Sequence, residues 1–229
     1  MNIHSVASSG PAVARRPSRR QAPSARRSPS AASSAPPPKR DLILRAATDV
    51  FADRGFFNAQ VADVARAAGI AAGTVYLYFR SKDDLLVSIF ERTMRDGLDE
   101  GRSAVAAIAD PIERLRRLAR LHLARLGRDR NLAIVFQVEL RQSTKFMERF
   151  SATLVRDYLG LIRSAFTDGQ TAGVFRSTIN PTVAAKMFFG ALDEMATNWI
   201  LSSRRYRLED DADAAVDLFV NGAKSQRVP

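Results

Sequence analysis

The feature that most constrains this fold is the stretch of residues 61–82, VADVARAAGIAAGTVYLYFRSK. Its first part has one apolar helix face, at the i, i+3, i+4, i+7 positions Val61, Val64, Ala65 and Ala68. Gly69 should end this helix, because a residue without Cβ readily adopts the left-handed conformation of a tight turn. A second short helix is expected over 72–79. Two short helices joined by a glycine-containing turn predict a helix-turn-helix, whose second helix can enter the major groove of DNA.

A further helix precedes this pair. It carries an apolar stripe made of Ile43, Ala46, Ala47, Val50 and Phe51, and Gly55 is expected to end it. We expect Phe56 and Phe57 to fill the space between this helix and the next two. Three helices between Arg40 and Phe79 therefore predict a small bundle that presents its last helix, and we place this DNA-binding domain at 39–84.

These residues resemble the DNA-binding signature of the TetR family. The segments VADVA, AGI, GTVYLYF and SKDDLL stand where the family has its conserved elements. The resemblance implies a transcriptional repressor that binds a double-stranded DNA operator. The family usually has Thr or Ser where this chain has Ala59 and Gln60. We therefore expect Asn58 to cap the second helix, and the Gln60 amide to reach a phosphate.

The same resemblance assigns DNA contacts to the third helix. Base edges are expected opposite Ala72, Gly73, Thr74 and Leu77, and phosphates opposite Tyr76, Tyr78 and Lys82. Phosphate contacts fix the position on the duplex, and small or apolar side chains can meet thymine methyl groups. Val75 and Phe79 are expected in the core. Because the helix lacks Arg, Asn and Gln, we expect part of the specificity to come from DNA shape.

The N-terminal segment has a different composition. Residues 1–40 hold eight basic residues and no acidic one, in a chain of net charge +11, and they are rich in Ser, Ala and Pro. Such a composition predicts a disordered basic tail, which we place at 1–38. The tail either follows DNA phosphates or has no role in sequence recognition.

The rest of the chain has the periodicity of amphipathic helices and no segment with a strand period. Helix starts are indicated by Ser81 with Asp84, by Asp110-Pro111 and by Asn180-Pro181. The expected helices are 82–100, 111–127, 131–142, 143–169, 181–199 and 209–221. Taken alone, 131–142 also allows a strand, but its neighbours favour a short buried helix. The predicted fold class is all-α, with an N-terminal three-helix helix-turn-helix domain and a C-terminal helical domain at 85–225.

The C-terminal domain also resembles a narrower group, the FadR-type acyl-CoA-responsive repressors of fatty-acid degradation within the TetR family. The resemblance rests on NLAIVFQVELRQS, FFGALDEMATNWI and QVADVARAAGIAAGTVYLYF. It implies a ligand-binding and dimerisation domain whose last two helices pair with a second copy in a homodimer. It also implies that long-chain acyl-CoA, as the small-molecule effector, binds this domain and releases the operator.

Candidate ligand residues follow from this implication. An acyl chain needs flexible and aromatic walls, for which the candidates are Phe136, Leu140, Phe166, Met187, Phe188, Met195 and Trp199. The phosphates of CoA need cations, for which the candidates are Arg128, Arg130, Arg141 and Lys145. The competing interpretation of the apolar set is an ordinary hydrophobic core. The competing interpretation of the cationic set is a solvated charged surface. Asp193 or Glu194 is expected to form a buried ion pair with Arg141, and His122 is expected to be a satisfied core histidine.

Composition excludes other classes of function. The chain has no Cys and only two His, which excludes disulfides and thiolate metal sites, and we expect neither a metal nor a cofactor. No apolar run approaches the length of about 20 residues that a membrane helix needs, so we expect a cytoplasmic protein without a membrane partner. Catalytic patterns are missing too, and we expect no enzyme. The rival functions are a TetR-type regulator of a drug or another hydrophobic ligand, and a nonspecific nucleic-acid or membrane binder that uses the basic tail.

Overall fold

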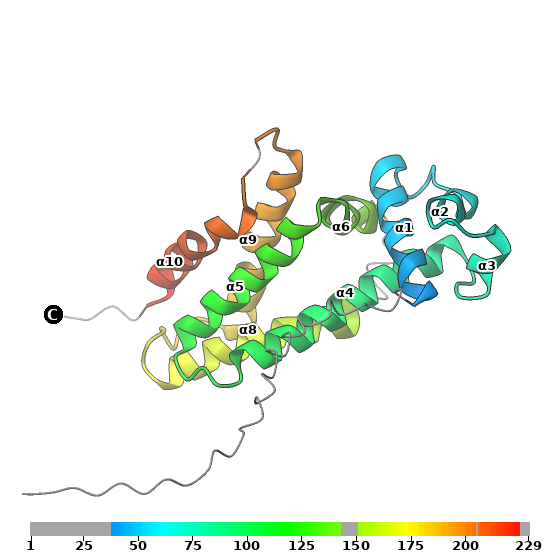
Figure 1. Cartoon of the computed structure of the whole chain (residues 1–229). Helices are drawn as coiled ribbons and strands as arrows, with labels where there is room; N and C mark the ends of the chain where they lie inside the picture. Colours follow the sequence, from blue (N-terminus) through cyan, green and yellow to red (C-terminus); the bar gives the residue numbers. More distant parts are fainter. Residues whose placement is uncertain (1–37, 143–150, 205, 225–229) are drawn as a thin grey trace, which may run out of the picture. The chain divides into compact units, whose positions relative to one another are not determined.

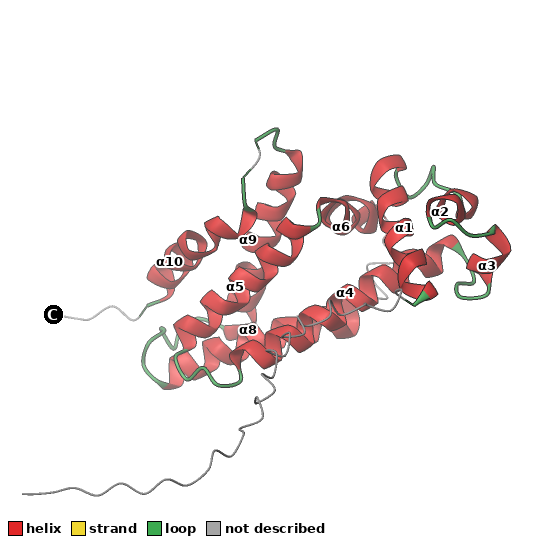
Figure 2. Cartoon of the chain, viewed as in Figure 1, coloured by secondary structure: helices red, strands yellow, loops and turns green. Residues whose placement is uncertain are grey.

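The computed structural model describes residues 38–142, 151–204 and 206–224. Within these ranges the chain forms helices and loops, and the one β-bridge, between Phe175 and Lys224, belongs to no strand (Figure 2). The predicted all-α class is confirmed. The predicted tail at 1–38 lies outside the described residues except for Pro38, as does Lys145.

The N-terminal part, which we call the head, contains α1 (Lys39–Arg54), α2 (Val61–Ala67) and α3 (Ala72–Tyr76). Gly55 and Gly69 have φ of 76° and 66°, so both turns use the conformation that glycine permits. The core of the head contains Phe51, Phe56, Val64, Val75 and Phe79. The prediction for Phe57 was wrong, because its side chain is 64% exposed.

Helix α4 (Lys82–Val105) connects the head to the remaining helices (Figure 1). Its start is capped as predicted, since Ser81 Oγ accepts a hydrogen bond from Asp84 N at 3.1 Å. The first turns of α4 belong to the core of the head, through Leu85, Leu86, Ile89 and Phe90. The helix is continuous past the predicted domain boundary at 84/85 and ends five residues later than the predicted Glu100.

The effector part contains α5 (Pro111–Arg128), α6 (Arg130–Ile134), α8 (Arg156–Thr171), α9 (Pro181–Leu201) and α10 (Ala212–Ala223). The starts of α5 and α9 follow the sequence signals. Asp110 Oδ1 accepts from Ile112 N at 2.8 Å, and Asn180 Oδ1 accepts from Thr182 N at 2.9 Å. A second core, separate from that of the head, includes Leu118, Ile162, Phe166, Phe188 and Val216.

π-Helical segments and 3-10 turns replace parts of three predicted α-helices. After α6 the chain continues as a π-helical segment, η1 (Val135–Glu139), and a 3-10 turn, η2 (Leu140–Gln142). A second π-helical segment, η3 (Ser151–Val155), leads into α8, and the start of the predicted helix 143–169 lies outside the described residues. Another 3-10 turn, η4 (Leu208–Asp211), occupies the predicted start of the last helix. Periodicity alone does not separate these turns from α-helix.

Candidate DNA-binding surface and effector cavity

The residues predicted to face DNA lie on an exposed surface of the head. Ala72, Gly73, Tyr76, Leu77 and Tyr78 are exposed and Thr74 is partly exposed, whereas Val75 and Phe79 are buried as predicted. Leu77 is 82% exposed, which is unusual for a large apolar side chain. Helix α3 ends at Tyr76, so Leu77 and Tyr78 lie in the turn that follows it.

The start of α2 differs from the prediction. Its N-cap is Gln60, whose backbone N–H donates to Asp63 Oδ2 at 3.1 Å. This hydrogen bond, together with the nearby Arg54 and Arg66, holds the pKa of Asp63 below its usual value. Asn58 is not the cap, because its side-chain amide donates to Arg54 O at 3.1 Å. The exposed Gln60 remains placed to reach a phosphate.

Lys82 is engaged within the head. Its Nζ donates to the carbonyl oxygens of Phe56, Phe57 and Ala59 at 2.7, 3.0 and 2.9 Å. The ammonium also lies 4.6 Å from the centroid of the Phe56 ring. Since an ammonium has three donors, these carbonyls use all of them. Its predicted role as a phosphate ligand stays a prediction, and its structural role is to hold the α1–α2 loop.

Two cations that the sequence reasoning missed lie beside α3. Arg80 is exposed directly after the buried Phe79, and the Arg40 guanidinium lies 5.2 Å from the Phe79 ring centroid. Both are suited to phosphates, because guanidinium groups form strong hydrogen bonds with phosphate oxygens. The position of Arg80 inside the motif was an available signal, whereas Arg40 lies far from the motif in the sequence.

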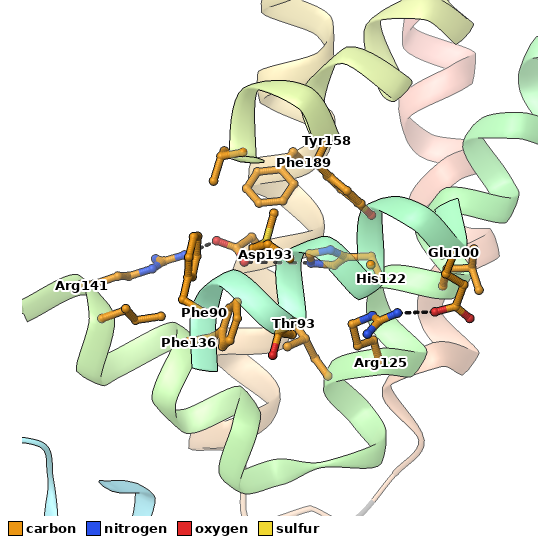
Figure 3. Close-up of a pocket in the computed structure, with 16 residues that line it drawn as sticks. Phe90, Thr93, Glu100, His122, Arg125, Phe136, Arg141, Tyr158, Phe189 and Asp193 are labelled. Atoms are coloured by element: carbon orange, nitrogen blue, oxygen red, sulfur yellow. Dashed lines mark hydrogen bonds and ion pairs between the residues drawn. The ribbon is translucent and has the colours of Figure 1, made fainter. Parts of the chain in front are cut away.

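A cavity of about 160 Å³ lies in the effector part (Figure 3). Residues of α4, α5, η1, η2, η3, α8 and α9 surround it. The apolar lining is Phe90, Met94, Leu121, Leu126, Phe136, Leu140, Val155 and Phe189, and the polar lining is Thr93, Glu100, His122, Arg125, Arg141, Tyr158 and Asp193. The predicted ligand residues Phe136, Leu140 and Arg141 are among these.

A polar cluster centred on Asp193 occupies one side of this cavity (Figure 3). Arg141 forms the predicted ion pair with Asp193 Oδ2, but the pair is not buried, because the Arg141 side chain is 44% exposed. Gln137 Nε2 donates to Asp193 Oδ1 at 2.6 Å. His122 Nε2 lies 4.0 Å from the same Oδ1 and has no hydrogen-bond partner within the described residues. The prediction of a satisfied core histidine was therefore wrong, because His122 lines the cavity with one nitrogen unpaired.

Burial controls the protonation of the two titratable rings in the cavity wall. It lowers the pKa of His122, while Asp193 acts in the opposite direction and Arg125 adds to the lowering. Burial raises the pKa of the Tyr158 hydroxyl. Both rings are therefore neutral near pH 7, and each can form hydrogen bonds with a neutral polar group of a ligand.

The structure does not bring the other seven predicted ligand residues to this cavity. Phe166, Phe188 and Trp199 are buried in the second core, and Met195 packs against it. Met187 is 64% exposed on another face of α9. Arg130 stacks on Trp199 and donates to Ile200 O at 2.5 Å, so it caps the end of α9. Arg128 is exposed near Glu209.

A cationic groove of about 370 Å³ lies beside the cavity, between α8 and α9. Val155 lines both spaces. Three cations line the groove, namely Arg156, Arg163 and Lys186, and no acidic residue does. Arg156 lies 3.9 Å from Asp157, and no ion-pair partner of Arg163 or Lys186 occurs in the described part of the chain. The groove is therefore suited to an anionic group.

Family models match almost the whole described chain. The model of bacterial regulatory proteins of the tetR family matches residues 43–89, and the model of the C-terminal region of YsiA-like proteins matches residues 90–222. The chain belongs to the TetR family. Like other TetR regulators, it is a transcriptional repressor that binds operator DNA as a homodimer.

Several TetR proteins of known structure or function are similar over their full length. The fatty acid metabolism regulator protein of Bacillus subtilis is 33% identical over 81% of this chain and 95% of its own. The structure of the fatty acid degradation regulator FadR of Bacillus halodurans superposes with a TM-score of 0.77, at 36% identity over 84% of this chain and all of that one. The structure of FadR of Bacillus subtilis in complex with stearoyl-CoA superposes with a TM-score of 0.75, at 32% identity over 80% of this chain and 98% of that one.

These relatives are regulators of fatty acid metabolism or degradation. No helix within the described residues of this chain is both long and apolar enough to cross a membrane. Nor do those residues group three His, Asp or Glu side chains around a possible metal position.

Proposed function

We propose that this TetR repressor controls genes of fatty-acid degradation and leaves its operator when long-chain acyl-CoA binds. The observation that carries this is a cavity with many apolar and aromatic lining residues beside a groove whose charged lining residues are all cations. The cavity suits an acyl chain, and the groove suits the phosphates of CoA. The similarity to FadR proteins, one crystallised with stearoyl-CoA, supports the same ligand.

The cations that we assign to the CoA phosphates differ from those predicted by the sequence. Arg130 is engaged at the end of α9, and Arg141 pairs with Asp193. The cations at the groove have no comparable hydrogen bonds. We therefore propose the Arg156, Arg163 and Lys186 groove for the phosphates and the neighbouring cavity, reached past Val155, for the acyl chain.

The DNA contacts keep their sequence-based assignment except for Lys82. We propose that Ala72, Gly73, Thr74 and Leu77 face base edges and that Gln60, Tyr76 and Tyr78 bind phosphates, with Arg40 and Arg80 added. Lys82 holds the loop from which Gln60 extends. The boundary between the DNA-binding and effector domains at 84/85 stays a prediction, although Leu85, Leu86, Ile89 and Phe90 pack in the core of the head. We propose a cytoplasmic protein, because it must reach operator DNA.

The dimer face is proposed on α9 and α10. Val183 and Met187, one turn apart on α9, and Leu218 on α10 are exposed large apolar residues. Pairing of these helices in two copies would bury them and hold the two α3 helices about 34–36 Å apart, the separation of successive major grooves. An effector would release DNA to the extent that it binds a differently spaced dimer more tightly.

Isothermal titration calorimetry with stearoyl-CoA, free CoA and free stearate tests this proposal. We expect strong binding of the thioester alone, because only it fills both cavity and groove. Replacing Arg156, Arg163 and Lys186 together by Ala should weaken binding of stearoyl-CoA at least tenfold. The matched control is the double variant Arg128→Ala and Arg130→Ala, which should bind normally. Equal weakening in both variants would contradict the placement of the phosphates.

The volume of the cavity favours a second candidate, a sensor of a smaller hydrophobic ligand such as a drug. A volume of about 160 Å³ is below the range of about 300–1,000 Å³ that is common for drug-sized ligands. A long acyl chain must therefore enlarge the cavity, whereas a small apolar ligand need not. Absence of heat with stearoyl-CoA, free CoA and free stearate would favour this candidate.

A further inference from the structure

We propose that Glu139 is the positioning residue through which the effector cavity controls the DNA-binding head. The inference rests on the proposed function in that an effector occupies this cavity, and it adds the element that transmits the signal. Glu139 belongs to η1, the π-helical segment that contributes to the cavity wall and also contacts the head.

The head end of this connection is a hydrogen bond to the α1–α2 loop. The side chain of Glu139 is buried, with the residue 7% exposed, and its Oε2 accepts from Phe56 N at 2.7 Å. A buried carboxylate without a partner is costly, so this amide stabilises Glu139 where it lies. Gly55 precedes the amide, and a Cβ at Gly55 would lie 3.8–3.9 Å from the Glu139 oxygens, so the Glu139 carboxylate lies against the backbone of Gly55.

The same loop is held from its other side by Lys82. Its Nζ binds the carbonyl oxygens of Phe56 and Ala59, so the peptide groups flanking Phe56 are fixed by a carboxylate and an ammonium together. Ala59 is followed directly by Gln60, the N-cap of α2. A displacement of Glu139 therefore changes the start of the helix that supports α3.

Three neighbours of Glu139 in the sequence connect it to the cavity: Phe136 and Gln137 on η1, and Leu140 at the start of η2. Phe136 stacks on Phe90 with ring centroids 5.4 Å apart, and both line the cavity. Gln137 donates to Asp193 on α9 at 2.6 Å, and Leu140 directly follows Glu139 in the cavity wall. Because these residues share one helical segment, an effector that displaces Phe136 or Leu140 also displaces Glu139.

The π-helical form of η1 fits this role. Such segments are rare within helices and occur frequently at functional sites. A ligand larger than the cavity must move the walls, and η1 is one wall that also contacts the head through a hydrogen bond. Effector binding and operator binding then compete for two positions of η1, which gives a coupling free energy between the sites.

The test uses the full-length variants E139A, E139Q and D110A. E139A removes the acceptor for Phe56 N, and E139Q keeps an oxygen acceptor. D110A is the matched control, because it removes a carboxylate–amide hydrogen bond of similar length, 2.8 Å, at the start of α5 and away from the head. Circular dichroism first confirms that each variant is helical.

The first readout is operator affinity by fluorescence anisotropy, with and without stearoyl-CoA, on a DNA fragment selected with the wild-type protein. Allosteric couplings are typically about 5- to 150-fold. We expect a change of that size for wild type, D110A and E139Q, and a change of less than about twofold for E139A. Calorimetry should show that all four proteins still bind stearoyl-CoA. A wild-type response in E139A, or loss of the response in both E139A and E139Q, would overturn the proposal.

The second readout needs no effector, and therefore separates this inference from the identity of the ligand. Hydrogen exchange of the backbone amides over 40–60 should be faster in E139A than in wild type, with exchange in α5 and α9 unchanged. In D110A, exchange should be faster at the start of α5 and unchanged over 40–60. If the head of E139A exchanges at the wild-type rate, Glu139 does not position it, whatever the effector is. If wild type gives no heat with stearoyl-CoA but E139A alters the head, the proposed ligand fails and the connection stands.

Discussion

Lys82 shows how a residue of the family motif acts inside the fold. Its ammonium joins three carbonyl groups of one loop, and hydrogen bonds to a charged group contribute about 1.5–3 kcal/mol each. A sequence motif records that a lysine is required at this place. It does not record whether the ammonium faces a phosphate or the protein's own backbone.

Replacing Lys82 by Met separates these two roles. We expect K82M to lower the free energy of unfolding by at least about 2 kcal/mol, because two partly buried hydrogen bonds and one exposed hydrogen bond lose a charged donor. Urea denaturation measures this change. The salt dependence of operator binding should keep its wild-type slope, whereas loss of a phosphate contact would reduce the slope by about 1. A stable variant with a reduced slope would contradict the structural role.

His122 should make stability depend on pH. Burial lowers its pKa in the folded protein, whereas in the unfolded chain the imidazole takes up its proton near pH 6.5. The unfolded state then binds more protons as pH falls from 7.5 to 5.5, so the free energy of unfolding falls in that window, by at most about 1.4 kcal/mol per pH unit. In H122F this component should disappear. Urea denaturation at pH 7.5, 6.5 and 5.5 measures both proteins, and parallel profiles would refute the role of His122.

At the scale of elements, close packing of α8 against the Phe175 segment allows a controlled test. A Cβ on Gly169 would lie 2.3 Å from Phe175 Cδ2, and the Phe175 ring stacks on Phe166 with centroids 4.8 Å apart. Gly169→Ala should therefore destabilise the protein by about 1–3 kcal/mol through overpacking. Gly160, in the same helix, has nothing within 4 Å of its Cβ position, and Gly160→Ala should stabilise by about 0.5–1 kcal/mol. Thermal unfolding of the two variants should shift in opposite directions, and equal shifts would refute the packing explanation.

The elements that the sequence predicted well are those with local signals. Gly69, Asp110 and Asn180 each act on backbone groups within a few residues, so their caps and turns follow from the sequence. The form of η1 depends instead on contacts with α9 and the head, which no local pattern records.

The residues that line the cavity could not be predicted from local patterns either. Met187 and Phe189 are two residues apart on α9 and both apolar, but one is exposed and the other lines the cavity. Periodicity places them on different faces without saying which face meets the ligand. Phe136, Leu140 and Arg141 were found because a resemblance drew attention to their segment. Tyr158 and Arg125 carried no such signal.

At the scale of the whole molecule, dimerisation can be tested on the proposed α9 and α10 face. The double variant M187E and L218E should be largely monomeric in analytical ultracentrifugation, because it places four charges in a paired apolar interface. Operator affinity should fall with it, since one head alone reads one half-site. F57E is the matched control, because Phe57 is as exposed as Met187, 64%, but lies on the head. A monomeric control or a dimeric double variant would contradict the assigned face.

The small size of the effector cavity has a consequence for the physiology of the repressor. If the resting form encloses only about 160 Å³, a long-chain ligand binds a rarer, expanded form, and its apparent dissociation constant rises in proportion to that rarity. The strength of packing among Phe90, Phe136 and Phe189 then sets the intracellular concentration at which transcription begins. Substitutions that loosen these rings would make the cell derepress these genes earlier, without changing any contact with the operator.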